Sequence, residues 1–84
     1  MSLQDFYQEM LSKLEQMTDS ELIDAFNREV GNQGWVSYRG AYLSAIHKTF
    51  LKRGFDISEI GNEQVLSFKR KVELIEKKLI PLAS

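Results

Sequence analysis

The chain has 84 residues, 43% of them hydrophobic, a formal net charge of −1, one histidine and no cysteine. This length predicts one domain over residues 1–84, and the apolar fraction is typical of a globular protein rather than a disordered one. The absence of cysteine excludes a disulfide framework and a thiolate metal site. The apolar runs are too short to span a membrane, and the first residues do not resemble a signal peptide, so we expect a cytoplasmic protein.

The first predicted element is an amphipathic helix over residues 3–17, because apolar residues recur there every three or four positions. Thr18 follows, and Glu21 stands three residues later in the spacing of a capping box. A second helix is therefore expected over 19–30. Gly31 is a natural left-handed stop for it.

The third predicted helix covers residues 38–53, with Ser37 as its cap and Gly54 as its end. Apolar residues occupy most of its circumference, and only a narrow strip around Ser44, Lys48 and Lys52 is clearly polar. A helix with so wide an apolar surface is usually surrounded by other elements, so we expect this one to be central.

The last predicted helix covers residues 63–80, with Asn62 as its cap and Pro81 at its end. Six apolar residues between 65 and 82 step alternately by three and four, as in a heptad seam. Residues 55–61 are expected to form an ordered connector. The sequence thus predicts a compact all-α bundle of about four short helices, and three helices with a bent connector are the alternative.

Charge is distributed unevenly along the chain. Residues 1–34 contain seven acidic and two basic residues, whereas residues 35–84 contain nine basic and five acidic ones. The halves could face a polarised partner, or they could pair with each other inside the fold. We favour the internal pairing because packed neighbours of opposite charge need no partner.

No motif predicts catalysis. The single histidine, His47, falls at the margin of the apolar arc of its helix and is expected to pack there and form a local hydrogen bond. The acidic residues fall mostly on polar helix faces and form no obvious acid–base pair. We therefore expect no enzyme, no catalytic residue, no metal ligand and no cofactor.

The preferred function is a small soluble interaction or structural module, with a protein partner or a second copy of the chain as its ligand. The loop before the third helix is the expected contact surface, because tryptophan and arginine are enriched at binding hot spots. Trp35 could instead fill the core. We also predict that Arg39 contacts Glu29. The residues assigned to partner binding are Gln33, Trp35, Tyr38 and Arg39.

A second candidate surface for self-association is the outer face of helix 63–80, where Leu66 and Leu74 are expected to be exposed. The alternative function is nucleic-acid binding through the basic and aromatic stretch 35–53. The acidic net charge argues against nucleic acid as a ligand, and no membrane partner is expected. The residues assigned to this alternative are Arg39, Lys48, Lys52 and Arg53.

Overall fold

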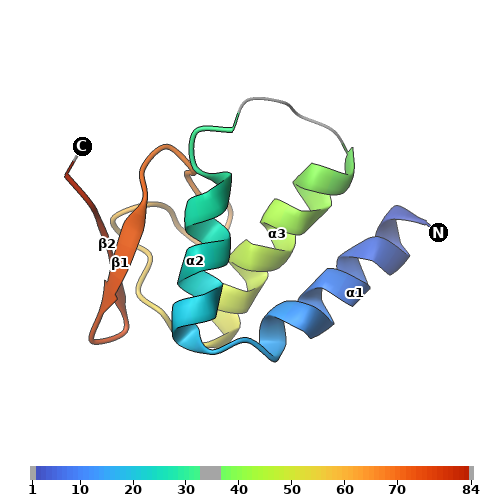
Figure 1. Ribbon diagram of the computed structural model, residues 1–84, viewed down its shortest axis with the longest axis horizontal. Coiled ribbons are helices and arrows are strands. Elements are labelled where there is room, and N and C mark those ends of the chain that lie inside the picture. Colours follow the sequence, from blue (N-terminus) through green and yellow to red (C-terminus); the bar gives the residue numbers. More distant parts are fainter. Residues whose placement is uncertain (1, 33–36, 84) are drawn as a thin grey trace.

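The computed structural model describes residues 2–32 and 37–83 and shows three helices followed by a two-stranded antiparallel hairpin (Figure 1). The helices are α1 (Leu3–Glu15), α2 (Asp19–Glu29) and α3 (Ser37–Lys52). The strands are β1 (Val72–Ile75) and β2 (Lys78–Pro81). α3 lies between α1 and α2, and the hairpin packs beside α2 (Figure 1).

Local capping explains where α1 and α2 begin and where α2 and α3 end. Thr18 and Glu21 form the expected capping box, with Glu21 N donating to Thr18 Oγ1 at 3.1 Å and Thr18 N donating to Glu21 Oε1 at 2.9 Å. Ser2 and Asp5 form a second capping box at α1. Gly31 and Gly54 follow α2 and α3 with φ of 82° and 73°, the left-handed conformation that glycine adopts at little cost.

The core lies where α2 and α3 meet the hairpin and the connector, which is the name used from here on for residues 54–68. Phe26 and Phe50 are fully buried, with ring centroids 5.6 Å apart, and Phe68 stacks on Phe26 at 4.6 Å. α1 contributes only one buried residue, Leu14, and packs mainly against α3. The hairpin adds two buried residues, Val72 and Leu79.

The prediction of an all-α bundle is wrong, because residues 63–80 form an irregular segment and the hairpin instead of a fourth helix. The heptad spacing of apolar residues there does not describe one buried face. Val65 and Ile75 belong to the predicted seam, yet they are 62% and 50% exposed. Val72 and Leu79 are buried because each faces inward from its own strand, and alternation within two short strands can imitate steps of three and four.

The residue types in the hairpin turn explain why the sequence does not predict the two strands. Glu76 and Lys77 connect Ile75 to Lys78, which pair directly across the hairpin. Both turn residues have positive φ, 48° and 71°, as in a type I′ turn. Such turns usually contain Asn-Gly or Asp-Gly, and a Glu-Lys pair gives no turn signal.

Asn62 does bond as a capping residue, but no helix follows it. Its Oδ1 accepts from Gln64 N at 2.8 Å and from Val65 N at 3.0 Å. The chain then turns back, and Asn62 N donates to Val65 O at 2.8 Å. Gly61 makes this return possible, since a Cβ there would lie 2.2 Å from Val65 O.

Each edge of the hairpin forms hydrogen bonds to another element. The Asn27 side chain on α2 donates to Val72 O at 3.0 Å and accepts from Val72 N at 2.9 Å. On the other edge, Asp56 N donates to Lys77 O at 2.7 Å, and Leu79 N donates to Asp56 O at 3.0 Å. These bonds satisfy backbone groups that an edge strand would otherwise present to other chains.

Candidate functional site

Arg39 and Glu29 join the start of α3 to the end of α2. Arg39 Nε donates to Glu29 Oε1 at 3.1 Å, and Arg39 Nη2 donates to the Glu29 backbone carbonyl at 3.1 Å. Each side chain is only 19% exposed, so solvent screens the pair less than it would a surface pair. The predicted contact between these residues is confirmed.

The remaining residues assigned to partner binding divide into two groups. Gln33 and Trp35 lie outside the described residues, and so does the choice between a core and a contact role for Trp35. Tyr38 is 46% exposed at the first turn of α3. Its ring meets Phe6 of α1 edge to face, with centroids 4.9 Å apart. The structure therefore places Tyr38 beside α1.

Arg53 holds the turn between α1 and α2. Its Nη2 donates to the backbone carbonyls of Met17 at 2.6 Å and Leu14 at 3.0 Å, and its Nη1 donates to Asp19 Oδ1 at 2.7 Å. These carbonyls lie in the last turn of α1 and just beyond its end, where backbone acceptors have few partners within the helix. The Arg53 side chain is 18% exposed. Arg53 therefore makes its hydrogen bonds within the fold, to the turn between α1 and α2.

The rest of the predicted nucleic-acid stretch is similarly engaged. Lys52 pairs with Glu15 of α1, with side chains 50% and 44% exposed. Tyr42 is half-buried, and burial followed by the negative charge of Glu29 raises the pKa of its phenol. Lys48 is exposed and forms no ion pair with a described residue. Of the four basic residues assigned to nucleic acid, three are thus paired with acidic residues of the described fold, and Lys48 is not.

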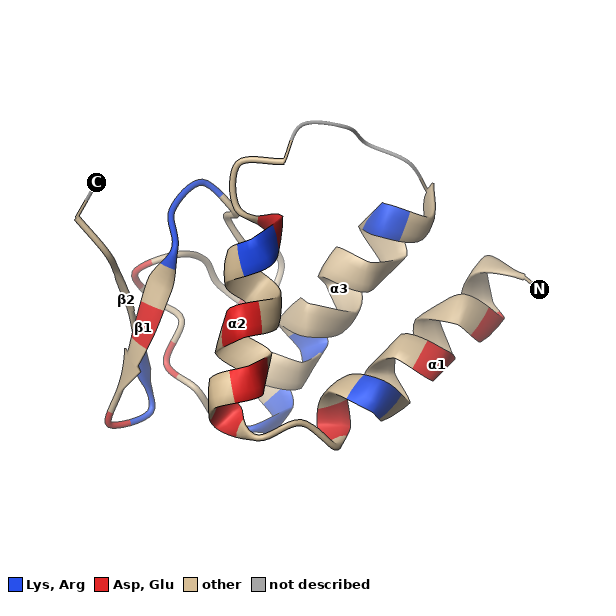
Figure 2. Ribbon diagram, in the orientation of Figure 1, with Lys and Arg blue, Asp and Glu red and all other residues tan. Residues whose placement is uncertain are grey.

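Three of these pairs join the acidic first part of the chain to the basic second part. They are Glu29–Arg39, Glu15–Lys52 and Asp19–Arg53. Figure 2 shows the acidic positions of α1 and α2 alongside the basic positions of α3. The favoured interpretation, in which the two halves pair within the fold, is confirmed at these contacts.

His47 lines a hollow of about 240 Å³ between α3 and the connector. Its Nε2 lies 2.7 Å from the Asn62 backbone carbonyl, so the neutral ring can donate a proton there. The residues around this hollow include Ser44 and Gln64 but no carboxylate. Within the described residues, His47 thus lacks the acidic partner that would orient it as a catalytic base.

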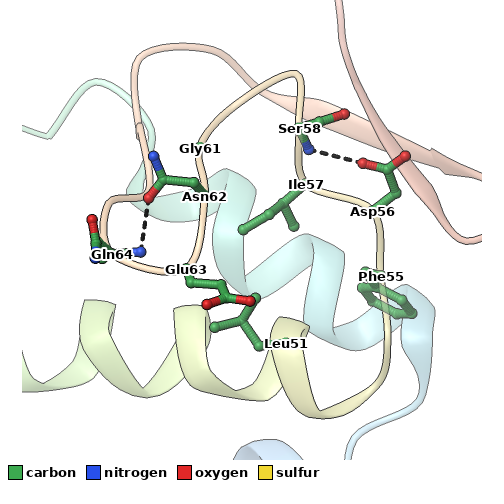
Figure 3. A pocket seen from close by; sticks show the side chains of 9 residues that line it. All are labelled: Leu51, Phe55, Asp56, Ile57, Ser58, Gly61, Asn62, Glu63 and Gln64. Atoms are coloured by element: carbon green, nitrogen blue, oxygen red, sulfur yellow. Dashed lines mark hydrogen bonds between the residues drawn. The ribbon is translucent and has the colours of Figure 1, made fainter.

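A larger hollow of about 550 Å³ opens between the end of α3 and residues 55–64 (Figure 3). The apolar residues that line it are Leu51, Phe55 and Ile57. Figure 3 shows the Glu63 carboxylate beside Leu51, whereas the Asp56 carboxylate turns away toward Ser58. The two carboxylates do not converge, so the hollow provides no acid–base pair.

Two polar side chains of this hollow, Asp56 and Asn62, form hydrogen bonds within local turns. Ser58 N donates to Asp56 Oδ1 at 2.9 Å. Hydrogen bonding to the side chain and backbone of Ser58 lowers the pKa of the Asp56 carboxyl. Asn62 is occupied by its own turn. Among residues 2–32 and 37–83, no cluster of three His, Asp or Glu side chains could hold a metal ion.

Two surface features remain as candidate contact sites. The first is the apolar side of α1, where Leu3 is 45% exposed and the Phe6–Tyr38 pair lies at the edge. The second is a run of three exposed basic residues, Lys69 to Lys71, between the connector and β1 (Figure 2). Sequence reasoning missed this run, because consecutive residues on the expected helix would point about 100° apart.

The predicted dimerisation surface on residues 63–80 is not present. Leu66 and Leu74 are half-buried and pack against the core, because the segment is not helical. In the part of the chain that the structure describes, no helix has the length and apolarity to cross a membrane. Comparisons of the chain with protein-family models, with curated proteins and with solved structures find no match.

Proposed function

We propose that the protein is a small interaction module without catalytic activity and that it self-associates through one side of α1. This surface, called the α1 surface below, consists of Leu3 and Phe6 of α1 together with Tyr38 of α3. The observation that carries the proposal is the exposure of one edge of the apolar face of α1: Tyr7, Met10 and Leu11 pack against the core, whereas Leu3 is 45% exposed beside Tyr38, which is 46% exposed. A helix face of this kind normally requires a covering element.

Charges beside the α1 surface favour a second copy as the covering element. Glu9 and Lys13 pair along α1 at 3.4 Å, with side chains 44% and 63% exposed. On a helical wheel both positions lie beside Phe6, on its polar side. A two-fold axis near Phe6 would place the Leu3, Phe6 and Tyr38 side chains of two antiparallel copies against each other, with the Glu9–Lys13 pair at the rim of the contact. Because this rim pair is neutral as a whole, two identical surfaces can approach without repulsion between like charges.

The contact is expected to be weak, because one helix side buries less than the roughly 1,600 Å² of a standard stable interface. We expect a dissociation constant on the order of 100 μM, equivalent to about 5–6 kcal/mol. Sedimentation velocity between about 10 μM and 1 mM should therefore show the mean mass rise above the 9.7 kDa of a monomer.

The double variant L3K/Y38K tests the surface itself. Both side chains are nearly half exposed, so lysine at these positions should leave the fold intact and keep the protein monomeric. V65K is the matched control, because Val65 is 62% exposed on the connector, away from α1. V65K should associate like the wild type. A wild-type protein that stays monomeric over the whole range would overturn the proposed self-association.

A further inference from the structure

The run Lys69–Arg70–Lys71, called the basic ledge below, differs from Arg39, Lys52 and Arg53 in its electrostatic surroundings. Arg39, Lys52 and Arg53 each form an ion pair with an acidic residue of α1 or α2 or of the turn between them. None of the three ledge residues forms an ion pair with a described acidic residue, and all three are exposed. The ledge is therefore a positive surface that the described fold does not neutralise.

The backbone on both sides of the ledge is fixed by bonds to other elements. Gly31 N, just after α2, donates to Phe68 O at 3.3 Å, and Leu82 N donates to Lys71 O at 2.8 Å. The next residue, Val72, is held by the Asn27 amide. The three cations consequently project from a preorganised backbone, which lowers the entropy lost when a ligand binds.

Apolar hollows lie on two sides of the ledge. One, of about 280 Å³, is lined by Val30, Leu82 and Ala83 together with all three basic residues. The other, also of about 280 Å³, is lined by Ile60 and Pro81 and shares Lys69 and Arg70 with the first. Glu59 borders the second hollow, but it pairs with Lys78 at 3.6 Å, so it does not cancel the ledge.

We propose that the basic ledge binds an acidic peptide segment of a partner protein, with aliphatic side chains entering the two hollows. Carboxylates of the peptide would pair with the ledge, and Arg70 can accept one in the bidentate geometry that guanidinium favours. An apolar floor with a charged rim is the usual anatomy of a protein interface. This site is separate from the α1 surface and does not depend on self-association.

A peptide fits this surface better than a nucleic acid does. Single-stranded nucleic acids are bound by aromatic side chains on which the bases stack, in a positively charged groove. No aromatic residue is among those that line the two hollows. The chain as a whole has a net charge of −1, which would weaken attraction to a long polyanion. Carboxylates interspersed with aliphatic groups match both the charge and the apolar floor.

The test measures fluorescence anisotropy of a labelled nine-residue peptide that alternates Glu and Val. We expect saturable binding on the order of 100 μM at low salt, weakening at least fivefold when salt rises to about 0.5 M. A peptide with Gln for Glu should lose most of the affinity, and one with Ser for Val should lose about fivefold or more. Absence of saturable binding up to about 1 mM protein would overturn the proposal.

Variants locate the site. K69Q/R70Q/K71Q should weaken binding at least tenfold, because all three partners of the peptide carboxylates are lost. A83E should also weaken it several-fold, since it adds a carboxylate to the first hollow while leaving the ledge intact. The matched control removes three exposed lysines elsewhere and gives the same net charge. Its substitutions are K13Q, K48Q and K77Q.

Two results would contradict the assignment. Equal loss of affinity in the ledge variant and in the control would show that the peptide responds only to net charge. Tighter binding of a labelled ten-nucleotide single-stranded DNA than of the acidic peptide, lost in the ledge variant, would assign the ledge to nucleic acid. Circular dichroism of each variant checks that the helices are retained, so that lost binding is not lost folding.

Discussion

Replacing Arg53 by Met should destabilise the protein far more than replacing its neighbour Lys52 by Met. Arg53 makes three close contacts, two of them to backbone carbonyls at the end of α1, and its side chain is only 18% exposed. Hydrogen bonds that involve a charged group contribute about 1.5–3 kcal/mol each. The bond to Asp19 is discounted to about 1 kcal/mol, because that carboxylate is 46% exposed.

We therefore expect the free energy of unfolding to fall by about 3 kcal/mol in R53M, once partial rehydration of the two carbonyls is allowed for. In a domain of this size that corresponds to a loss of roughly 12–24 °C in Tm. K52M removes only an exposed pair with Glu15 and should change the free energy by about 0.2–1 kcal/mol. R53K keeps the charge but not the planar fork, so its loss should be intermediate.

Urea unfolding followed by circular dichroism measures these differences, and thermal melts give an independent value of Tm. R53M and K52M matching within about 0.5 kcal/mol would refute the reasoning, because burial and carbonyl contacts would then carry no weight beyond an ordinary surface charge. An R53K variant as stable as the wild type would refute the part of the argument that depends on the guanidinium geometry.

Three further outcomes follow from the same structure. N27D should lose about 2 kcal/mol, because a carboxylate cannot donate to Val72 O, and amide exchange of the hairpin should accelerate. The turn substitution E76N/K77G should raise Tm by a few degrees, since both residues have positive φ. Hydrogen bonds from the N-cap lower the pKa of Glu21. Its ionised form therefore stabilises the fold above the unfolded pKa, and this stability is lost as pH falls below about 4. In thermal melts between pH 2 and pH 6, the Tm of E21Q should therefore fall less on acidification than the Tm of the wild type.

The sequence predicts the helices well because their signals are local. Thr18 and Glu21 define the start of α2 within four residues, and Gly31 and Gly54 mark stops that need positive φ. The contact between Glu29 and Arg39 also follows from helix faces that meet across a short connection. In each case the deciding interaction lies within about ten residues of chain.

The hairpin could not be predicted because its deciding interactions are distant in sequence. Val72 is held by Asn27, which is 45 residues away. The other edge is held by Asp56, in a segment whose apolar residues follow no single period. The Glu76-Lys77 turn has no sequence signal that would indicate a hairpin. A helix over 63–80 would spread the three basic residues of the ledge around its circumference, so the helix prediction does not indicate their clustering.

The sequence separation of 45 residues between Asn27 and Val72 also limits the order in which the chain can fold. Strands of four residues are too short to be stable as an isolated hairpin, so β1 and β2 must form on a partner that already exists. That partner is the last turn of α2, which presents Asn27. The helices can therefore assemble first, and the hairpin joins them later as one cooperative unit. In the native state β1, β2 and the basic ledge that is tied to β1 should therefore open together as one unit.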